Sequence, residues 1–115
     1  MAVKNQTHGK ATAFGGGSTS LNVDYHSLKK AALVLRALNH KLRQQILKLI
    51  EDKKKITVTE IYVKLRLEQS VASQHLAILR RAGIVLTERD GKFIYYGVNF
   101  KRIDEISHFV EGLLK

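Results

Sequence analysis

The chain contains no cysteine, and this absence removes several functions at once. Without thiols there are no disulfides, thiolate metal ligands or cysteine-based redox switches, which fits a reducing cytosol. No apolar run resembles a signal peptide or approaches the length of a membrane span. No nucleophile motif, paired-carboxylate pattern or cofactor loop is present. We therefore expect a cytoplasmic protein that is not an enzyme and has no cofactor and no membrane partner.

Positive charge is in excess. The 115 residues include 20 Lys and Arg against 10 Asp and Glu, a formal net charge of +10, which favours a polyanionic partner. Most of the excess lies in residues 24–56, which hold nine basic and three acidic residues. The Lys53–Lys55 run is typical of a solvated loop. Net charge therefore supports nucleic-acid binding only weakly.

The length suits one domain preceded by a tail. Residues 1–20 are rich in Gly, Ser and Thr, a composition that predicts a flexible tail. Residues 21–115 are predicted to form one domain, mostly α-helical with a small β-hairpin. So small a domain buries limited apolar area, and an oligomeric interface would help to stabilise it.

Two helices are predicted in the first half of the chain. Asp24 can cap a helix that runs to about Leu38, and the apolar residues of this helix cover more than one side. Such a helix needs a second partner besides its own core. Asn39 is predicted to cap the next helix, before a loop over Asp52–Lys55 and a short strand at Lys55–Ile56.

A helix-turn-helix pattern follows. Thr57–Glu60 matches the capping box, in which the Thr hydroxyl and the Glu carboxylate satisfy backbone N–H groups reciprocally. Arg66–Glu68 is short enough for the turn. A second helix is predicted from about Gln69 to Arg81, and Gly83 is a natural C-terminal cap.

A hairpin and a last helix complete the expected domain. Ile84–Glu88 and Phe93–Val98 are rich in β-branched and aromatic residues, and the Asp90-Gly91 pair between them is a strong hairpin signal. The order is that of a winged helix-turn-helix. A final helix is predicted from about Arg102 to Leu114, and its buried residues are expected to be Ile103, Ile106, Phe109, Val110 and Leu113.

The second helix of the motif carries the residues that indicate DNA binding. Its inner face is predicted to be Ala72, Leu76 and Leu79, and its outer side Ser70, Ser73, Gln74 and Ala77. A helix in the major groove needs short polar side chains in its first turns; Ser bonds to either kind of base edge and Gln pairs with adenine. Gln69 and Ser70 could equally bind phosphates at the helix N-terminus.

The hairpin tip is a second candidate contact. Arg89 and Lys92 bracket the tip, where they could reach a phosphate or an adjacent minor groove. Glu88 and Asp90 oppose them, so we expect the wing to contribute modestly.

Four stretches of the sequence together resemble the ArsR/SmtB family of bacterial winged-helix repressors: residues 37–47, residues 67–85, Asp90-Gly91-Lys92 and Tyr95-Tyr96. The resemblance covers roughly residues 24–114. It implies a homodimer built from the first and last helices, one reading helix per half-site, and repression relieved by an inducer. DNA contacts are predicted at Gln69, Ser70, Val71, Ser73, Gln74, Arg80, Arg89 and Lys92.

The resemblance does not extend to the family's metal sites. Its soft-metal sensors carry a cysteine pair in or just before the first helix of the motif, and residues 60–62 here contain none. Its zinc sensors use the two ends of the last helix, where this chain has Phe100, Arg102 and Leu113. We therefore predict that the family's metal sites are absent.

Other histidines and carboxylates are given structural roles. Asp104, His108 and Glu111 have zinc-type side chains, yet they lie opposite the apolar stripe and are predicted to form the solvent face of the last helix. His75 is predicted to pack or hydrogen-bond within the reading helix. His8, His26 and His40 have no convergent partner in sequence.

We predict a sequence-specific transcriptional regulator, a homodimer that binds double-stranded DNA at a near-palindromic operator and represses transcription. Half-sites are expected roughly 34–36 Å apart. The extra apolar face of the first helix, with Phe109 and Leu113, is expected to form the dimer. Two alternatives stay open: a winged helix that binds a partner protein, and non-specific nucleic-acid binding. Salt dependence and sequence preference distinguish them.

Overall fold

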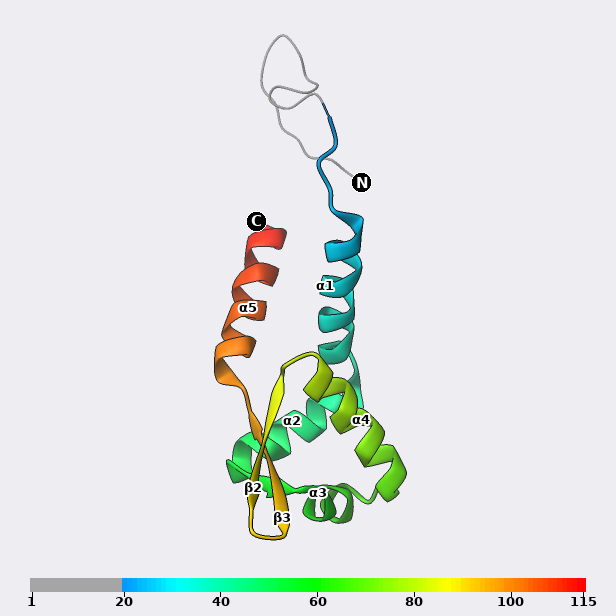
Figure 1. The fold of residues 1–115 in the computed structure, drawn as a ribbon, viewed down its shortest axis with the longest axis vertical. Coiled ribbons are helices and arrows are strands. Elements are labelled where there is room, and N and C mark those ends of the chain that lie inside the picture. The colour runs from blue at the N-terminus through cyan, green and yellow to red at the C-terminus, as the bar shows by residue number, and fades with distance from the viewer. Residues whose placement is uncertain (1–19) are drawn as a thin grey trace.

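The computed structural model describes residues 20–115, which form five helices and one three-stranded antiparallel sheet (Figure 1). Helices α1 (Tyr25–Leu38) and α5 (Phe100–Leu114) extend from the body in the same general direction. The body consists of α2 (Lys41–Lys53), α3 (Val58–Leu65), α4 (Gln69–Arg81) and the strands β1 (Ile56–Thr57), β2 (Val85–Asp90) and β3 (Phe93–Val98). The predicted tail, residues 1–20, lies outside the described residues except for Ser20.

The start of α1 confirms the sequence prediction, but the start of α2 does not. The Asp24 carboxylate accepts hydrogen bonds from the backbone N–H groups of His26 and Ser27 at 3.1 and 3.3 Å. Asn39, predicted to cap α2, instead ends α1, with its N–H donating to Leu35 O at 3.0 Å. His40 is the N-cap of α2 in an extended conformation and provides no side-chain cap. Asn is favoured at both ends of helices, so the sequence pattern alone does not show whether Asn39 ends α1 or begins α2.

The helix-turn-helix motif is confirmed. Thr57 and Glu60 form the complete capping box at the start of α3. Arg66 ends α3 in the left-handed conformation, with φ of 57°. Glycine often occupies this position in such turns, because it adopts a positive φ without steric strain. Helix α4 has the predicted bounds, and Gly83 follows it with φ of 77°.

The sheet has the order β1-β3-β2, so the hairpin is extended by one short strand. Helix α2 continues to Lys53, which shortens the predicted loop, and the short strand is Ile56–Thr57 rather than Lys55–Ile56. The last hairpin pair is Asp90 with Phe93, leaving Gly91 and Lys92 as the two-residue turn. Only Gly91 has a positive φ, which fits a type II′ turn.

The core lies where α2, α3, α4 and the sheet meet. Its largest fully buried side chains are Ile46, Ile50, Ile56, Ile61, Leu76, Leu79, Ile84 and Val85. The predicted inner face of α4 is confirmed, because Ala72, Leu76 and Leu79 are all buried.

Helix α5 contributes less to this core than predicted. It begins at Phe100 because Asn99 caps it, accepting from Arg102 N at 3.3 Å. Ile106 is buried, but Phe109 and Leu113 are 50% and 67% exposed, so the prediction that the chain buries them is wrong. The outer part of α5 extends beyond the body (Figure 1), and the exposed fractions show that the rest of the described chain leaves these two side chains largely uncovered. Among the described residues, no helix has the length and apolar character needed to cross a membrane.

Candidate nucleic-acid interface

The first turns of α4 present the predicted polar side chains to solvent. Gln69, Ser70, Ser73 and Gln74 are all exposed. Within residues 20–115, none of their side chains hydrogen-bonds to the protein, so their donors and acceptors are available to a ligand. The buried side chains on the opposite face fix the orientation of the helix, and the polar face therefore points outward.

The N-terminus of α4 is open, unlike that of α3. Glu68 is the N-cap in an extended conformation, and its side chain makes no capping hydrogen bond. The first hydrogen bond of the helix is from Ala72 N to Glu68 O at 3.1 Å, so the N–H groups of residues 69–71 have no partner in the described chain. Free N–H groups and the helix dipole favour a bound anion such as a DNA phosphate.

Two further predicted positions lie at the limits of this face. Val71 is half-buried, at its boundary with the interior. Arg80 is exposed in the last turn of α4. At about 100° per residue Arg80 lies near the azimuth of Gln69, but roughly 16 Å farther along the axis. Ala77, predicted on the outer side, is half-buried.

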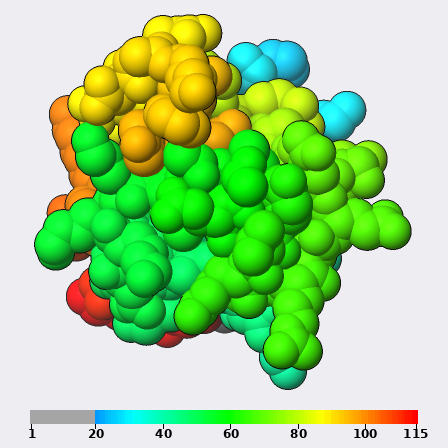
Figure 2. Space-filling view, turned by 90° about the horizontal axis from the view of Figure 1, so that it is seen from below, coloured from blue at the N-terminus to red at the C-terminus, as the bar shows by residue number. Residues whose placement is uncertain are grey.

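The wing lies on the same end of the molecule as α3 (Figure 1). Figure 2, viewed toward that end, shows the hairpin as one raised edge, α3 in the middle and α4 on another side. Arg89 and Lys92 are both exposed at the tip. One guanidinium nitrogen of Arg89 donates to Gly91 O at 3.2 Å, and Lys92 Nζ lies 5.4 Å from the centre of the Phe93 ring. Both cations therefore remain at the tip, as predicted.

A basic segment next to the wing was not predicted as part of the site. β1 pairs with β3, with Thr57 opposite Tyr95. Lys55 Nζ lies 4.9 Å from the centre of the Tyr95 ring, so the exposed Lys53–Lys55 segment lies beside the base of the hairpin. The only signal in the sequence was the β-propensity of Ile56 and Thr57. Two residues are too few to indicate which strand they pair with.

A buried arginine holds α4 in place. Arg43 of α2 is only 6% exposed. It donates to Ala37 O at 2.7 Å and Arg36 O at 3.0 Å at the end of α1, and to Nδ1 of His75 in α4 at 3.1 Å. A guanidinium has no acceptor, so Nδ1 of His75 must accept and its proton must lie on Nε2. One side chain thus joins α1, α2 and α4.

His75 confirms its predicted packing role. Burial, together with the neighbouring His40 and Arg43, lowers the pKa of His75 below its ordinary value, which favours the neutral ring that accepts from Arg43. The rings of His40 and His75 lie 4.9 Å apart between centres, a contact between residues distant in the sequence.

Residues of the α5 cap hold the other end of α4. Arg102 Nε donates to Ala82 O at 3.1 Å, and Asn99 Nδ2 donates to Gly83 O at 2.9 Å. Arg102 also forms an exposed ion pair with Glu105 at 3.4 Å. These contacts fix α4 relative to α5. Nothing in the sequence indicated these contacts, because Arg102 stood out only as a residue that cannot bind the family's zinc.

The candidate metal ligands of α5 face solvent. Asp104 and His108 are 74% and 73% exposed in their side chains and contact each other at 3.5 Å. Glu111 is also exposed. In the part of the chain that the structure describes, no three His, Cys, Asp or Glu side chains converge as a metal site would require.

Fold and surface together define the class of protein: a DNA-binding winged helix-turn-helix transcriptional regulator. The family model "Bacterial regulatory protein, arsR family" matches residues 40–87. The chain belongs to the ArsR family, which confirms the resemblance seen in the sequence. Membership makes it a transcriptional regulator and not an enzyme.

Three relatives illustrate the likeness. An uncharacterized HTH-type transcriptional regulator of Methanocaldococcus jannaschii, MJ1325, is 34% identical over 85 residues, covering 74% of this chain and 96% of the relative. The transcriptional activator HlyU of Vibrio cholerae is 40% identical over 84 residues, covering 73% of this chain and 77% of HlyU. The transcriptional repressor PagR of Bacillus anthracis is 33% identical over 84 residues, covering 73% and 84%.

Two of these relatives have solved structures with the same fold. Reduced HlyU aligns with a TM-score of 0.58 at 33% identity, covering 72% of this chain and 87% of HlyU. PagR aligns with a TM-score of 0.59 at 31% identity, covering 78% and 99%. The fold prediction is therefore confirmed.

Proposed function

We propose that the protein is a homodimeric repressor that binds a near-palindromic DNA site through α4. The observation that carries the proposal is the first half of α4, where Gln69, Ser70, Ser73 and Gln74 are exposed, unbonded to the rest of the described chain, and next to an open helix N-terminus. Short polar side chains and free N–H groups together suit base edges and phosphates.

The proposed contacts divide by chemistry. Ser73 and Gln74 contact base edges, and Val71, at the boundary of the face, contacts a thymine methyl group. Gln69 and Ser70 bind a phosphate together with the open amides of α4. The remaining contacts to the DNA backbone come from Arg80, Arg89 and Lys92, together with the Lys53–Lys55 segment beside the hairpin. Phosphate contacts set affinity and register, and the base contacts set sequence preference.

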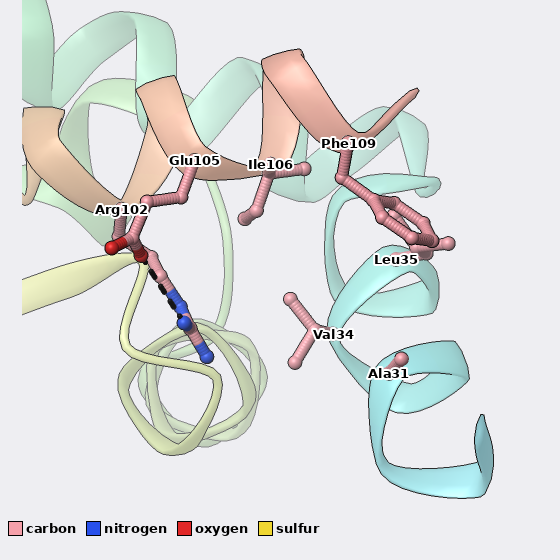
Figure 3. Close-up of a pocket in the computed structure, with 7 residues that line it drawn as sticks. All are labelled: Ala31, Val34, Leu35, Arg102, Glu105, Ile106 and Phe109. Atoms are coloured by element: carbon pink, nitrogen blue, oxygen red, sulfur yellow. Dashed lines mark hydrogen bonds and ion pairs between the residues drawn. The ribbon is translucent and has the colours of Figure 1, made fainter. Parts of the chain in front are cut away.

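The proposed dimer surface is the apolar side of α1 and α5. Figure 3 shows Ile106 and Phe109 of α5 pointing toward Val34 and Leu35 of α1 across an open space, whose volume is about 190 Å³. Large apolar side chains are exposed along this side of both helices: Tyr25, Leu28, Phe109, Leu113 and Leu114. A patch of this kind marks an interface, and two-fold symmetry would place one reading helix in each half-site.

Repression follows from occupancy, because a dimer bound over a promoter excludes the polymerase. One relative is named a repressor and another an activator, so the direction of regulation needs its own measurement.

We also propose that regulation does not use the metal sites of the family. The chain has no cysteine, and the carboxylates and histidine of α5 spread over an exposed face. Added zinc should leave operator affinity unchanged.

The experiment begins with selection of bound sequences from random DNA. Gln74→Ala should then weaken binding to the selected site by about 1–3 kcal/mol while thermal unfolding stays unchanged. Gln45→Ala, an exposed glutamine on α2, is the matched control and should bind as the parent does. A transcription assay on a promoter overlapping the selected site then tests repression.

Three results would count against the proposal. Selection without any preferred sequence would indicate non-specific binding. Equal affinity of Gln74→Ala and its control would remove α4 as the reading element. A monomer at micromolar concentration in sedimentation would exclude the two-fold arrangement.

A further inference from the structure

A second concave surface lies between α1 and α4. Its apolar part includes Leu33 and Val34 of α1 and Ile78 of α4, and its volume is about 530 Å³. Small-molecule sites commonly have about 300–1,000 Å³. Leu33 is 52% exposed in this groove, so a large apolar side chain remains open to solvent.

The charges lining this groove are all positive. Lys30, Arg36, Arg43, Arg81 and Arg102 contribute to it, and no carboxylate does. Arg43 is occupied by its three contacts, and Arg102 by Ala82 O and Glu105. The side-chain cations of Lys30, Arg36 and Arg81 form no hydrogen bond or ion pair with any other described residue; Arg36 takes part in the Arg43 contacts only through its backbone carbonyl. Three free cations therefore surround an apolar surface.

We propose that this groove binds a small organic anion, a carboxylate with an apolar body, and that its occupancy changes the affinity for DNA. The free cations provide charge-assisted hydrogen bonds to the carboxylate, and the apolar body covers the exposed leucine. A DNA phosphate would satisfy the cations but leave the apolar surface in water. The α1 helix of a second copy would bring Lys29, Lys30 and Arg36 with no acidic residue inside the helix, so its charge does not match.

The groove joins the two elements that the proposed function uses. One wall is α1, part of the proposed dimer surface, and the other is α4, the proposed reading helix. A ligand that bridges Arg36 of α1 and Arg81 of α4 would alter the angle between these two helices. It would thereby change the placement of the reading helices in a dimer. This regulatory part rests on the proposed function, whereas binding of the anion does not.

The binding test uses calorimetry on the full chain without DNA. Octanoate is the probe; octylammonium has the same apolar body with opposite charge, and inorganic phosphate is an anion without one. Octanoate should bind saturably with one site per chain, and the other two should not. The double variant K30Q/R36Q should weaken octanoate binding at least about tenfold. The control K29Q/K41Q removes two exposed charges from α1 and α2 and should bind octanoate as the parent does.

The regulatory test repeats DNA binding with and without octanoate. Octanoate should change operator affinity, and DNA should change octanoate affinity by the same factor, because coupling is reciprocal. Absence of saturable octanoate binding, equal binding of octylammonium, or equal loss in both double variants would overturn the site. Octanoate binding without any change in operator affinity would overturn its regulatory role. A failure to find a preferred operator would count against the proposed function and leave the calorimetric result standing.

Discussion

Replacing Arg43 with methionine tests whether one side chain joins α1, α2 and α4. The change removes the donor of Ala37 O and of His75 Nδ1, two acceptors in or near the buried part of the domain. Each buried acceptor left without a donor costs about 1–3 kcal/mol. The Arg36 carbonyl belongs to an exposed residue and can regain water, so it adds little. We expect a loss of about 3 kcal/mol in the free energy of unfolding.

The assay is urea and thermal unfolding followed by circular dichroism at equal protein concentrations, since a dimer's stability depends on concentration. For a domain of this size a loss of about 3 kcal/mol lowers Tm by roughly 12–24 °C. Lys41→Met is the matched control, an exposed cation on the same helix, and should change stability little. A loss below about 1 kcal/mol for Arg43→Met would refute the reasoning, because the three contacts would then contribute little to the free energy of unfolding.

A double-mutant cycle separates the helix contacts from one another. Of the contacts that Arg43 makes, His75→Ala removes only the one to α4, so the single and double variants together give the coupling between Arg43 and His75. We expect a coupling of about 1 kcal/mol or more, since contacting residues of one network typically couple by roughly 0.5–3 kcal/mol. Strictly additive losses would mean that Arg43 acts on the end of α1 alone.

Two further predictions concern pH and backbone conformation. The lowered pKa of His75 means that the unfolded chain takes up a proton first as pH falls below about 6.5. The contribution of His75 to stability is therefore complete above that pH and is lost below it; His75→Gln should flatten the profile measured by urea unfolding, and an unchanged slope would contradict this. Gly83→Ala should cost about 1–2 kcal/mol in thermal unfolding, because φ is +77° and the new Cβ would lie 3.3 Å from Arg102 Nε. An unchanged Tm would show that this turn relaxes freely.

Features set by neighbouring residues were predictable from the sequence. The capping box at Thr57, the bounds of α4 and the hairpin each depend on residues a few positions apart, and the structure has all three. The exposed polar face of α4 followed from the same periodicity, since burying Ala72, Leu76 and Leu79 leaves the opposite side outside.

Contacts between distant residues were not predictable. Arg43 reaches His75 across 32 positions, Arg102 reaches Ala82 across 20 and Asn99 reaches Gly83 across 16. An arginine in an amphipathic helix resembles a surface residue until the fold shows what covers it. The exposure of Phe109 has a related cause, because periodicity marks an apolar stripe but not which surface covers it.

The missing cap on α4 affects the protein when it is alone. The backbone amides of residues 69–71 have no acceptor in the described chain, so they can exchange their hydrogens with water without any unwinding, whereas the hydrogen-bonded amides of the core are protected. A bound polyanion would supply the missing acceptors and slow that exchange. The first turn of α4 would thus have all of its backbone N–H groups hydrogen-bonded only when the ligand is present.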